Sequence, residues 1–583
     1  MIGDGFPGRL VAALSRGIAT PIALLLATTM AAAQPKPAPA PNGPPRQMVA
    51  TAHSLATEAG LATLRRGGNA VDAMVAVQLV LGVVEPQSSG IGGGSLLLYW
   101  DAAARKLTSV DGLSRAPGSV DTGLAVDESG KPLSDAERRA VARSGRAIGV
   151  PGTMRLLHDV HRGRGKLAWD VLFQPAIAVA REGFAMPPYL FRTLTQATFA
   201  SDATAVPASF FGTDRKPLPV GTVIRNPALA DTLERLAREG VAPLYEGDIG
   251  AAIVAAATAG PLPGRMTAAD LAGYRTVERA PVCAPFRDRT VCAMPPPSFG
   301  GVGVLQVLGM VARHANGPVA FDQPRSVHVY VEAMRLASAD RLGWIGDPNH
   351  VDVPTAGLVD ARYLGDRAGL IRYDARIVRA SPGHPDDRHA DKVDLACTPP
   401  PPSTSQVAIV DRDGNALSLT TTLNLNFGSH ATAAGFGLNN VMTNFARAPR
   451  GGLTSPNAMA GDRRPVTSMA PTIVLGRDGR PEIVGGSAGG GEIVGYIAQS
   501  LLDMLANGRT PQQAIDTPHV AVMCDQVGLE KGTAAAALKP ALEALGHGVV
   551  ERPLNSRLQF LRRSGNGWIG GADARRDGVV GGF

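Results

Sequence analysis

Residues 399–428 constrain the fold of this chain more than any other stretch. They open with four consecutive prolines, at 399–402, which hold the backbone extended and fit neither a helix nor a central strand. Two runs with strand-like composition follow, at 405–410 and 416–424. Between them lies Asp413-Gly414, a strong hairpin signal because such turns need positive φ, which glycine adopts freely. The stretch therefore predicts a β-hairpin directly after an extended linker.

Thr404 stands at the start of this hairpin. A two-residue turn at the Asp-Gly pair would place Thr404 opposite Leu423. A one-residue bulge would instead bring it opposite Thr422 or Asn424. In each register the threonine hydroxyl lies beside a second hydroxyl and an amide, directly after a segment that is suited to cleavage.

Cleavage of the Ser403–Thr404 bond would turn Thr404 into an N-terminal nucleophile. A free α-amine has a pKa of about 7.7–8.0. It can therefore take the proton from the residue's own Oγ, and no separate histidine is required. The alternative is that Thr404 is an ordinary strand residue after a linker, since threonine is common in strands.

The composition gives no indication of nucleic-acid binding. The 583 residues are 45% hydrophobic and 18% charged, a globular balance that suits two to four domain-sized units or one large sandwich. The net charge is +7, but Lys and Arg are scattered and aromatic residues make up only 5%. Because a nucleic-acid groove needs clustered basic residues and stacking rings, we expect no such partner.

Residues 1–33 have the pattern of a secretory signal peptide. Two arginines precede an apolar core at 18–30, and Ala31-Ala32-Ala33 forms a small-residue cleavage site. The core is too short for a comfortable membrane span, and a Pro/Ala-rich spacer follows at 34–47. We therefore expect a periplasmic or secreted protein without a stable membrane span, whose folded part begins near Met48. The alternative is a retained N-terminal anchor.

Helical periodicity begins soon after Met48. It occurs twice within 50–81, interrupted at 65–69, where Asn69 would cap the second helix. A glycine-rich loop at 86–95 precedes a strand and lacks the Lys-Ser/Thr of a phosphate-binding loop, which favours close backbone packing. Further helices are expected at 153–160, 169–182, 226–239, 267–271, 302–313, 326–342, 493–507, 510–516 and 534–545, strands at 96–100, 281–300 and 404–491, and an irregular exposed linker at 350–400.

Histidines and cysteines do not indicate a metal site. Cys283 and Cys292 lie in two short apolar runs that can form a hairpin, and their spacing leaves open whether they form a disulfide. His158 and His161 have H-x-x-H spacing but no intervening glutamate, which favours a solvated helix face. The stretch 384–391 combines histidines with aspartates and is typical of a charged loop. We expect no metal and no cofactor.

Several motifs in this order resemble the γ-glutamyltranspeptidase family of N-terminal-nucleophile hydrolases. The resemblance extends from about Met48 to the C-terminus and implies a four-layer αββα sandwich of the α+β class. It also implies self-cleavage into a large chain, 48–403, and a small chain, 404–583, which stay associated. The motifs are GGNAVDAMVAVQLVLGVVEPQSSGIGGG, VPGT, QPAIAVAREGF, PPPSFGG, DRDGNALSLTTTLN, RRPVTSMAPTI and GGSAGG.

The resemblance assigns roles to the residues of the reaction centre. Thr404 would be the nucleophile, and its Oγ would attack the carbonyl of Ser403 during self-cleavage. Thr422 corresponds to the family threonine that hydrogen-bonds the nucleophile. Gly489 and Gly490 correspond to the glycine pair whose backbone N–H groups form the oxyanion hole, a task that needs no side chain.

The resemblance also implies a substrate pocket. Asn424 corresponds to an asparagine that contacts the substrate, while Thr467 and Ser468 correspond to paired hydroxyls that hold its α-carboxylate. The family arginine that clamps this carboxylate is replaced by Leu113. Arg115 lies two residues on, on the same face of a strand, and can partly replace the missing arginine.

A second charged position of the pocket is also changed. Asn444 stands where the family has an acidic residue that pairs with the substrate's α-ammonium, and Val441 replaces a glutamine. A charge-assisted hydrogen bond of this kind is typically worth about 1.5–3 kcal/mol. An asparagine at this position resembles the cephalosporin acylases of the family, which accept a glutaryl group without the amine. Asp111, in the same region as Leu113, is expected to be a turn residue rather than a catalyst.

We therefore expect a self-processing enzyme that cleaves, or transfers, γ-glutamyl or related acyl groups. Its partners would be small-molecule amides such as glutathione, and the reaction would pass through an acyl-Thr404 intermediate. One alternative is a glutaryl or cephalosporin acylase with little γ-glutamyl activity. Another is an exported binding protein that keeps the fold without turnover.

Overall fold

The computed structural model describes residues 43–583 except 121–125, 128–129, 132, 197–207, 391–392, 395–402 and 447–452. The predicted signal peptide, most of the predicted spacer and the proline run at 399–402 lie outside the described residues. Among the helices that the structure describes, none is long and apolar enough to cross a membrane.

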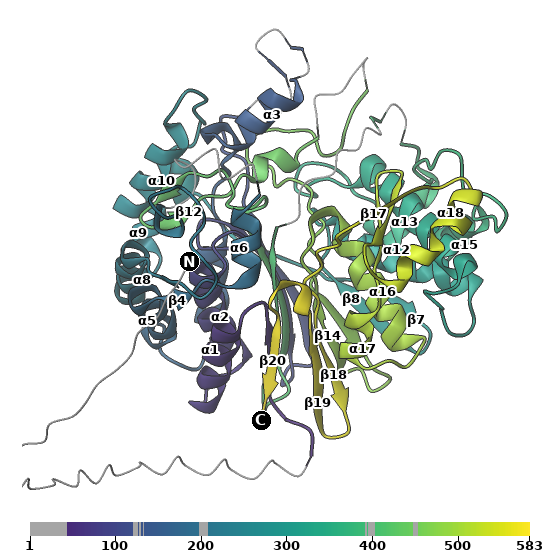
Figure 1. The fold of residues 1–583 in the computed structure, drawn as a ribbon, viewed down its shortest axis with the longest axis horizontal. Coiled ribbons are helices and arrows are strands. Elements are labelled where there is room, and N and C mark those ends of the chain that lie inside the picture. Colours follow the sequence, from purple (N-terminus) through teal and green to yellow (C-terminus); the bar gives the residue numbers. More distant parts are fainter. Residues whose placement is uncertain are drawn as a thin grey trace, which may run out of the picture. The chain divides into compact units, whose positions relative to one another are not determined.

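Two antiparallel sheets form the centre of the fold (Figure 1). The first has the order β20-β1-β9-β10-β2-β3-β6. Its strands are β1 Met48–Thr51, β2 Gly94–Asp101, β3 Lys106–Gly112, β6 Val277–Arg279, β9 Ser405–Val410, β10 Ala416–Thr422 and β20 Val579–Gly582. The second has the order β19-β18-β14-β13-β8-β7, with β7 Val282–Phe286, β8 Arg289–Ala293, β13 Thr472–Leu475, β14 Pro481–Gly486, β18 Gln559–Ser564 and β19 Gly567–Ala572.

Helices cover the outer face of each sheet (Figure 1). The helices that share a buried core with the first sheet are α1 Ser54–Arg65, α2 Ala70–Val84, α4 Thr153–Arg164, α5 Gln174–Glu182 and α8 Pro227–Glu239. Those that share a buried core with the second sheet are α12 Phe299–His314, α13 Pro324–Trp344, α15 Ala361–Gly369, α16 Ile493–Leu505 and α17 Pro511–Asp516. Shorter elements include α3 Asp135–Ala142, α6 Pro188–Leu194, α9 Ala242–Tyr245, α10 Asp248–Thr258, α11 Ala268–Ala272, α14 Thr355–Leu358, α18 Lys539–Ala544, β4 Phe184–Ala185, β5 Val223–Ile224, β11 Thr432–Ala433, β12 Phe436–Gly437, β15 Val520–Met523, β16 Gln526–Glu530 and β17 Gly548–Arg552.

Alternating side chains explain why the fold has four layers. Along β2, Leu97 and Tyr99 belong to the core shared with the helices, whereas Leu98 and Trp100 belong to a core between the two sheets. Successive side chains of a strand point to opposite faces, so a strand that is apolar on both faces is buried on both. The predicted four-layer αββα sandwich of the α+β class is therefore confirmed.

Two element predictions were wrong. Residues 50–51, predicted as the start of a helix, belong to β1, because this strand pairs with β20 on one side and β9 on the other. The stretch predicted as an irregular linker contains α14 and α15, and α15 buries Tyr363 and Leu364 in the second core. The predicted cap was right, because the Asn69 side chain accepts N–H groups at the start of α2.

The hairpin that carries Thr404 has the bulged register, not that of a two-residue turn. Thr421 lies opposite Ser405, which brings Thr404 level with Thr422. The five-residue loop is organised by Asp411, whose carboxylate accepts N–H groups from Asp413 and Asn415. A longer loop held by a carboxylate therefore sets the register.

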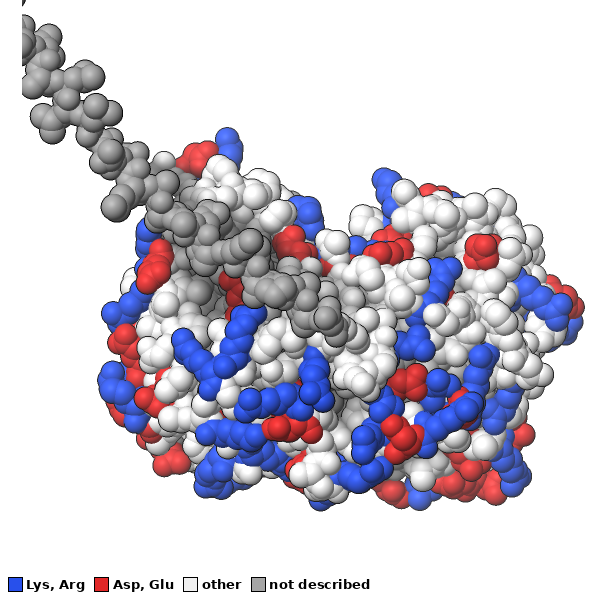
Figure 2. All heavy atoms as spheres, turned by 90° about the horizontal axis from the view of Figure 1, so that it is seen from below, with Lys and Arg blue, Asp and Glu red and all other residues white. Residues whose placement is uncertain are grey.

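The second sheet resolves the question of the cysteine pair. Cys283 and Cys292 lie opposite each other in β7 and β8 and form a disulfide. On the face shown in Figure 2, Lys and Arg are interspersed with Asp and Glu. This mixed distribution matches the scattered charges of the sequence.

Candidate active site

Thr404 directly precedes β9 and is almost fully buried, with 4% of its surface exposed. Its Oγ1 donates a hydrogen bond of 3.1 Å to Oγ1 of Thr422, in the adjacent strand β10. The Thr422 oxygen also accepts the backbone N–H of Asn424 at 2.8 Å. The structure therefore brings these three predicted residues together in one chain of hydrogen bonds.

The backbone at the predicted cleavage point is strained. Thr404 has φ 119°, a conformation that L-residues with a branched Cβ rarely adopt. Such a conformation costs about 1–3 kcal/mol and persists only when surrounding contacts impose it. Ser403 supplies one such contact, since its buried hydroxyl donates to the carbonyl of Gln87 at 2.9 Å.

A buried ion pair lies against the same residue. Nη1 of Arg557 donates to the carbonyl oxygen of Thr404 at 3.2 Å and pairs with the carboxylate of Glu85, which follows α2. That carboxylate also accepts the Ser405 hydroxyl at 2.7 Å. Burial raises the pKa of Glu85, while the charge of Arg557 and the hydrogen bond from Ser405 act in the opposite direction. Sequence reasoning missed this pair because nothing local marks two residues so far apart in the chain.

Gly489 and Gly490 form a tight turn between β14 and α16. Both have positive φ, 135° and 62°. A Cβ on Gly489 would lie 2.5 Å from Cε2 of Tyr496, so the position excludes other residues. Neither glycine amide donates a hydrogen bond to another described residue, which leaves both N–H groups available to a ligand.

The candidate substrate-binding residues lie in two places. The Asn424 side chain donates to Oγ1 of Thr443 at 2.8 Å, in the short helical turn Val441–Asn444 that ends at Asn444. The Asn444 carbonyl is held by the Asn457 side chain at 2.8 Å. The bond to Thr443 brings Asn424 and the turn containing Asn444 together.

Thr467 and Ser468 lie beside the start of α12. Thr467 forms a bridge with Ser298, the residue that caps this helix, and Oγ1 of Thr467 accepts the N–H of Met469 at 3.3 Å. Both candidate hydroxyl residues are buried, at 7% and 6% exposure. Their role in the pocket stays a prediction, because the hydrogen bonds of Thr467 lead to α12 and the neighbouring backbone rather than to Thr404.

The position of the missing arginine is apolar. Leu113 is 1% exposed and belongs to the core that also contains Val466. Arg115 is already engaged, because its guanidinium lies 3.2 Å from the Asp462 carboxylate and over the ring of Tyr274. A substrate carboxylate would have to compete with Asp462 for Arg115.

Asp111 is not the turn residue that was expected. It lies within β3, and its fully buried carboxylate pairs with Arg279 at 3.1 Å and Arg464 at 3.4 Å. It also accepts the N–H of Leu113. Asp111 therefore anchors the strand end that carries the substituted position.

The histidine clusters have structural partners. Nε2 of His161 contacts the carbonyl of Leu167 at 3.0 Å, and both His158 and His161 pack on Trp169. His161 is therefore not part of a solvated helix face. His384 and His389 stack on each other. The described part of the chain contains no group of three or more His, Cys, Asp or Glu suited to a metal ion.

Comparisons with known proteins show which protein family the chain resembles. The model of the family described as gamma-glutamyltranspeptidase matches residues 56–583. A glutathione hydrolase proenzyme from Bacillus subtilis (strain 168) is 31% identical over 480 residues, which covers 81% of this chain and 80% of that protein. An acylase ACY 1 proenzyme from Pseudomonas sp. (strain SE83) is 33% identical over 515 residues, covering 87% and 88%.

A solved structure has the same arrangement. The cephalosporin acylase from Bacillus halodurans superposes with a TM-score of 0.79 at 26% identity, over 95% of this chain and 99% of that one. The family match spans both sheets and both helical layers. This chain therefore belongs to the gamma-glutamyltranspeptidase family of enzymes.

Proposed function

We propose that the chain is a self-processing amidohydrolase with Thr404 as its nucleophile. The observation that carries the proposal is the Thr404–Thr422 hydroxyl contact of 3.1 Å at a strained backbone position. Oγ of Thr404 attacks the carbonyl of Ser403, and the acyl group moves from nitrogen to oxygen. Hydrolysis of the ester then releases a large chain that ends at Ser403 and a small chain, 404–583.

The free α-amine then acts as the general base of the mature enzyme. It accepts the proton from Oγ of Thr404 as that oxygen attacks the carbonyl carbon of the substrate amide. The N–H groups of Gly489 and Gly490 stabilise the resulting oxyanion. The proton passes to the departing amine, and water or an acceptor amine releases the acyl group from Thr404.

The substrate is an amide of a γ-glutamyl or related acyl group, such as glutathione, held by Asn424, Asn444, Thr467 and Ser468. The names of the relatives, glutathione hydrolase and acylase, support this class of substrate. Leu113 and Asn444 weaken the grip on a zwitterionic head group, because neither supplies a charge. This feature favours a second candidate, a glutaryl or cephalosporin acylase with little γ-glutamyl activity.

Residues 1–33 would direct the protein to the periplasm or the exterior. Fractionation of cells that express the full chain tests this part of the proposal. Recovery of the protein with the periplasm or medium, with an N-terminus after Ala33, is the expected result. Retention of residues 1–33 on a membrane-bound protein would contradict it.

A reducing denaturing gel tests self-processing. The chain has 60.3 kDa over 583 residues, or about 0.10 kDa per residue, so residues 34–403 and 404–583 predict fragments of about 38 and about 18 kDa. Thr404→Ala should give one uncut chain. Thr421→Ala removes a buried hydroxyl from the same hairpin and should still be cut. A Thr404→Ala protein that splits at this bond would refute the nucleophile assignment.

Substrate preference is tested separately with the processed enzyme. Hydrolysis rates of γ-glutamyl and glutaryl anilides are compared at equal concentrations. Faster γ-glutamyl cleavage supports the first candidate, and faster glutaryl cleavage supports the second. A processed protein that cleaves neither would point to a binding protein.

A further inference from the structure

Arg557 is the charged residue most closely associated with the nucleophile. It lies between β17 and β18 and has no exposed surface. Its Nη1 pairs with Glu85 and donates to the carbonyl of Thr404 and the hydroxyl of Ser405, both at 3.2 Å, and to Ser88 at 3.3 Å. One guanidinium nitrogen therefore joins the end of α2 to the first two residues of the predicted small chain.

The backbone of Arg557 holds a different part of the candidate site. Its N–H donates to Oγ of Ser487 at 3.3 Å, and its carbonyl accepts the N–H of Ala488 at 3.4 Å. Ala488 directly precedes Gly489 and Gly490. The same residue therefore contacts the nucleophile through its side chain and the predicted oxyanion segment through its main chain.

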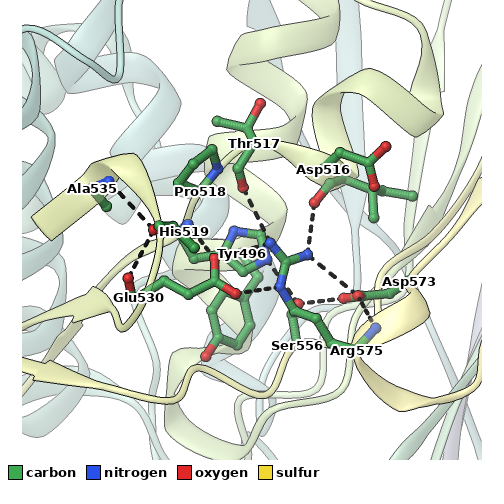
Figure 3. A network of polar contacts seen from close by, with 12 residues as sticks. Tyr496, Asp516, Thr517, Pro518, His519, Glu530, Ala535, Ser556, Asp573 and Arg575 are labelled. Carbon is green, nitrogen blue, oxygen red and sulfur yellow. Dashed lines mark hydrogen bonds and ion pairs between the residues drawn. The ribbon is translucent and has the colours of Figure 1, made fainter.

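A polar network fixes the two neighbours of Arg557, and Figure 3 shows the part of it around Ser556. Ser556 donates to the Asp573 carboxylate and lies 2.8 Å from Nε2 of His519. Asp573 also accepts the N–H of Leu558 at 3.3 Å. Arg575 bridges Asp573 and Glu530, as Figure 3 shows, and so anchors the network in the surrounding fold. The residues directly before and after Arg557 are therefore both hydrogen-bonded to the Asp573 carboxylate.

We propose that Arg557 is a positioning residue for Thr404, which sets the nucleophile relative to the oxyanion segment and makes its α-amine less basic. This inference rests on the proposed function, since it concerns the amine that cleavage creates. The guanidinium lies against the carbonyl of Thr404, one residue's backbone away from that amine. A nearby cation disfavours an ammonium group, so the amine stays neutral and ready to accept the Oγ proton at lower pH.

Other charges around Arg557 oppose or add to this effect. Glu85 carries the opposite charge and cancels part of the field at the amine. The remaining groups near Arg557 are Arg576, Asp577, Tyr189 and His53. Of these, Tyr189 places its ring 5.1 Å from the guanidinium carbon. The net effect on the amine is therefore that of a partly neutralised cation.

The test compares the acid limb of the pH profile of kcat/KM in processed variants. The probe is whichever anilide, γ-glutamyl or glutaryl, the wild-type enzyme cleaves. Arg557→Met should raise the apparent pKa of the acid limb by about one unit, because the cation that disfavours the ammonium form has been removed. Glu85→Gln should lower it, because the guanidinium then acts without its counter-charge. Arg557→Lys keeps the charge and should leave the limb within about 0.3 unit.

Self-processing gives a second readout. Without the contacts of Nη1, Arg557→Met should cleave the precursor at least tenfold more slowly, measured as fragment formation on a denaturing gel. The matched control is Arg335→Met, which removes another buried arginine, paired with Glu332 in the other helical layer. It should lower stability without moving the acid limb.

Failure of this inference can be separated from failure of the proposed function. An uncut wild-type chain would overturn the proposed function and this inference with it. A normally processed Arg557→Met enzyme with an unmoved acid limb would overturn only the inference. If Arg557→Met does not fold, an unmoved limb in Glu85→Gln, or a limb raised by a full unit in Arg557→Lys, would overturn it equally.

Discussion

The residues that contact Thr404 differ in how well they could be predicted from the sequence. Thr422 was a predictable partner, because a short hairpin brings the ends of its two strands level. Glu85 and Arg557 were not, because their ion pair joins residues 472 positions apart and neither stands in a pattern typical of a site. Local patterns therefore predicted the contact between the two threonine hydroxyls but not the buried ion pair beside it.

Asn444→Asp tests the head-group specificity of the pocket. Restoring the carboxylate provides a charged partner for the α-ammonium of a γ-glutamyl group. A charge-assisted hydrogen bond is worth about 1.5–3 kcal/mol, so kcat/KM for a γ-glutamyl anilide should rise by about 10- to 100-fold. Steady-state kinetics of the purified variant measure this change.

The glutaryl anilide is the internal control for this variant. It lacks the amine, so its kcat/KM should not rise, and Asn444→Ala should improve neither substrate. Equal gains on both anilides would contradict a specific contact with the amine. No gain on either would mean that Leu113, rather than Asn444, limits γ-glutamyl binding.

Secondary elements could be predicted where their signals are local. The cap at Asn69 follows from side chains within one turn, whereas α4, which begins at Thr153 without a side-chain cap, was predicted from its helical pattern. The strand β1 could not be predicted, since it is four residues long and forms only because β9 and β20 flank it. Its identity depends on partners from the far end of the chain, which no window along the sequence contains.

Asp411→Ala should destabilise the hairpin that follows Thr404. The Asp411 carboxylate is buried and accepts the N–H groups of Ala70, Asp413 and Asn415. Its removal leaves buried donors without acceptors and should lower the free energy of unfolding by about 2–4 kcal/mol. Urea denaturation followed by circular dichroism measures the change.

Asp413→Ala is the matched control in the same loop. Its carboxylate is 45% exposed and pairs with Lys166 on the surface, so its removal should cost less than about 1 kcal/mol. Equal destabilisation in Asp411→Ala and Asp413→Ala would show that the buried carboxylate does not organise the loop.

At the scale of the whole molecule, buried histidines should make the stability of the fold depend on pH. His547, on the small-chain side, contacts His328 on the large-chain side at 2.8 Å. Burial, helped by His328 and Arg335, lowers the pKa of His547 to about 4. Burial likewise lowers the pKa of His53 to about 4. Both groups are neutral in the folded protein over a range in which the unfolded chain is protonated.

Stability should therefore fall between pH 6.5 and pH 4. In this window the unfolded state binds more protons, so the contribution of each histidine is complete above pH 6.5 and disappears as the pH approaches 4. The decrease is about 3 kcal/mol per histidine, measured by urea unfolding at successive pH values. His547→Gln should make the free energy of unfolding depend less steeply on pH between pH 6.5 and 5. An unchanged dependence would rule out His547 as a cause of the loss of stability.

The order of strands in the first sheet has a consequence for a severed chain. β1, from the large-chain side, lies between β20 and β9, which both come from the small-chain side. The two polypeptides would be interwoven, and neither could dissociate without breaking the hydrogen bonds between strands of the sheet. Cleavage would therefore lower the stability of the native state only slightly. It would, however, make refolding a bimolecular reaction between the two chains. Recovery of the cut protein from denaturant should slow on dilution, whereas an uncut Thr404→Ala chain should regain its structure at a rate independent of concentration.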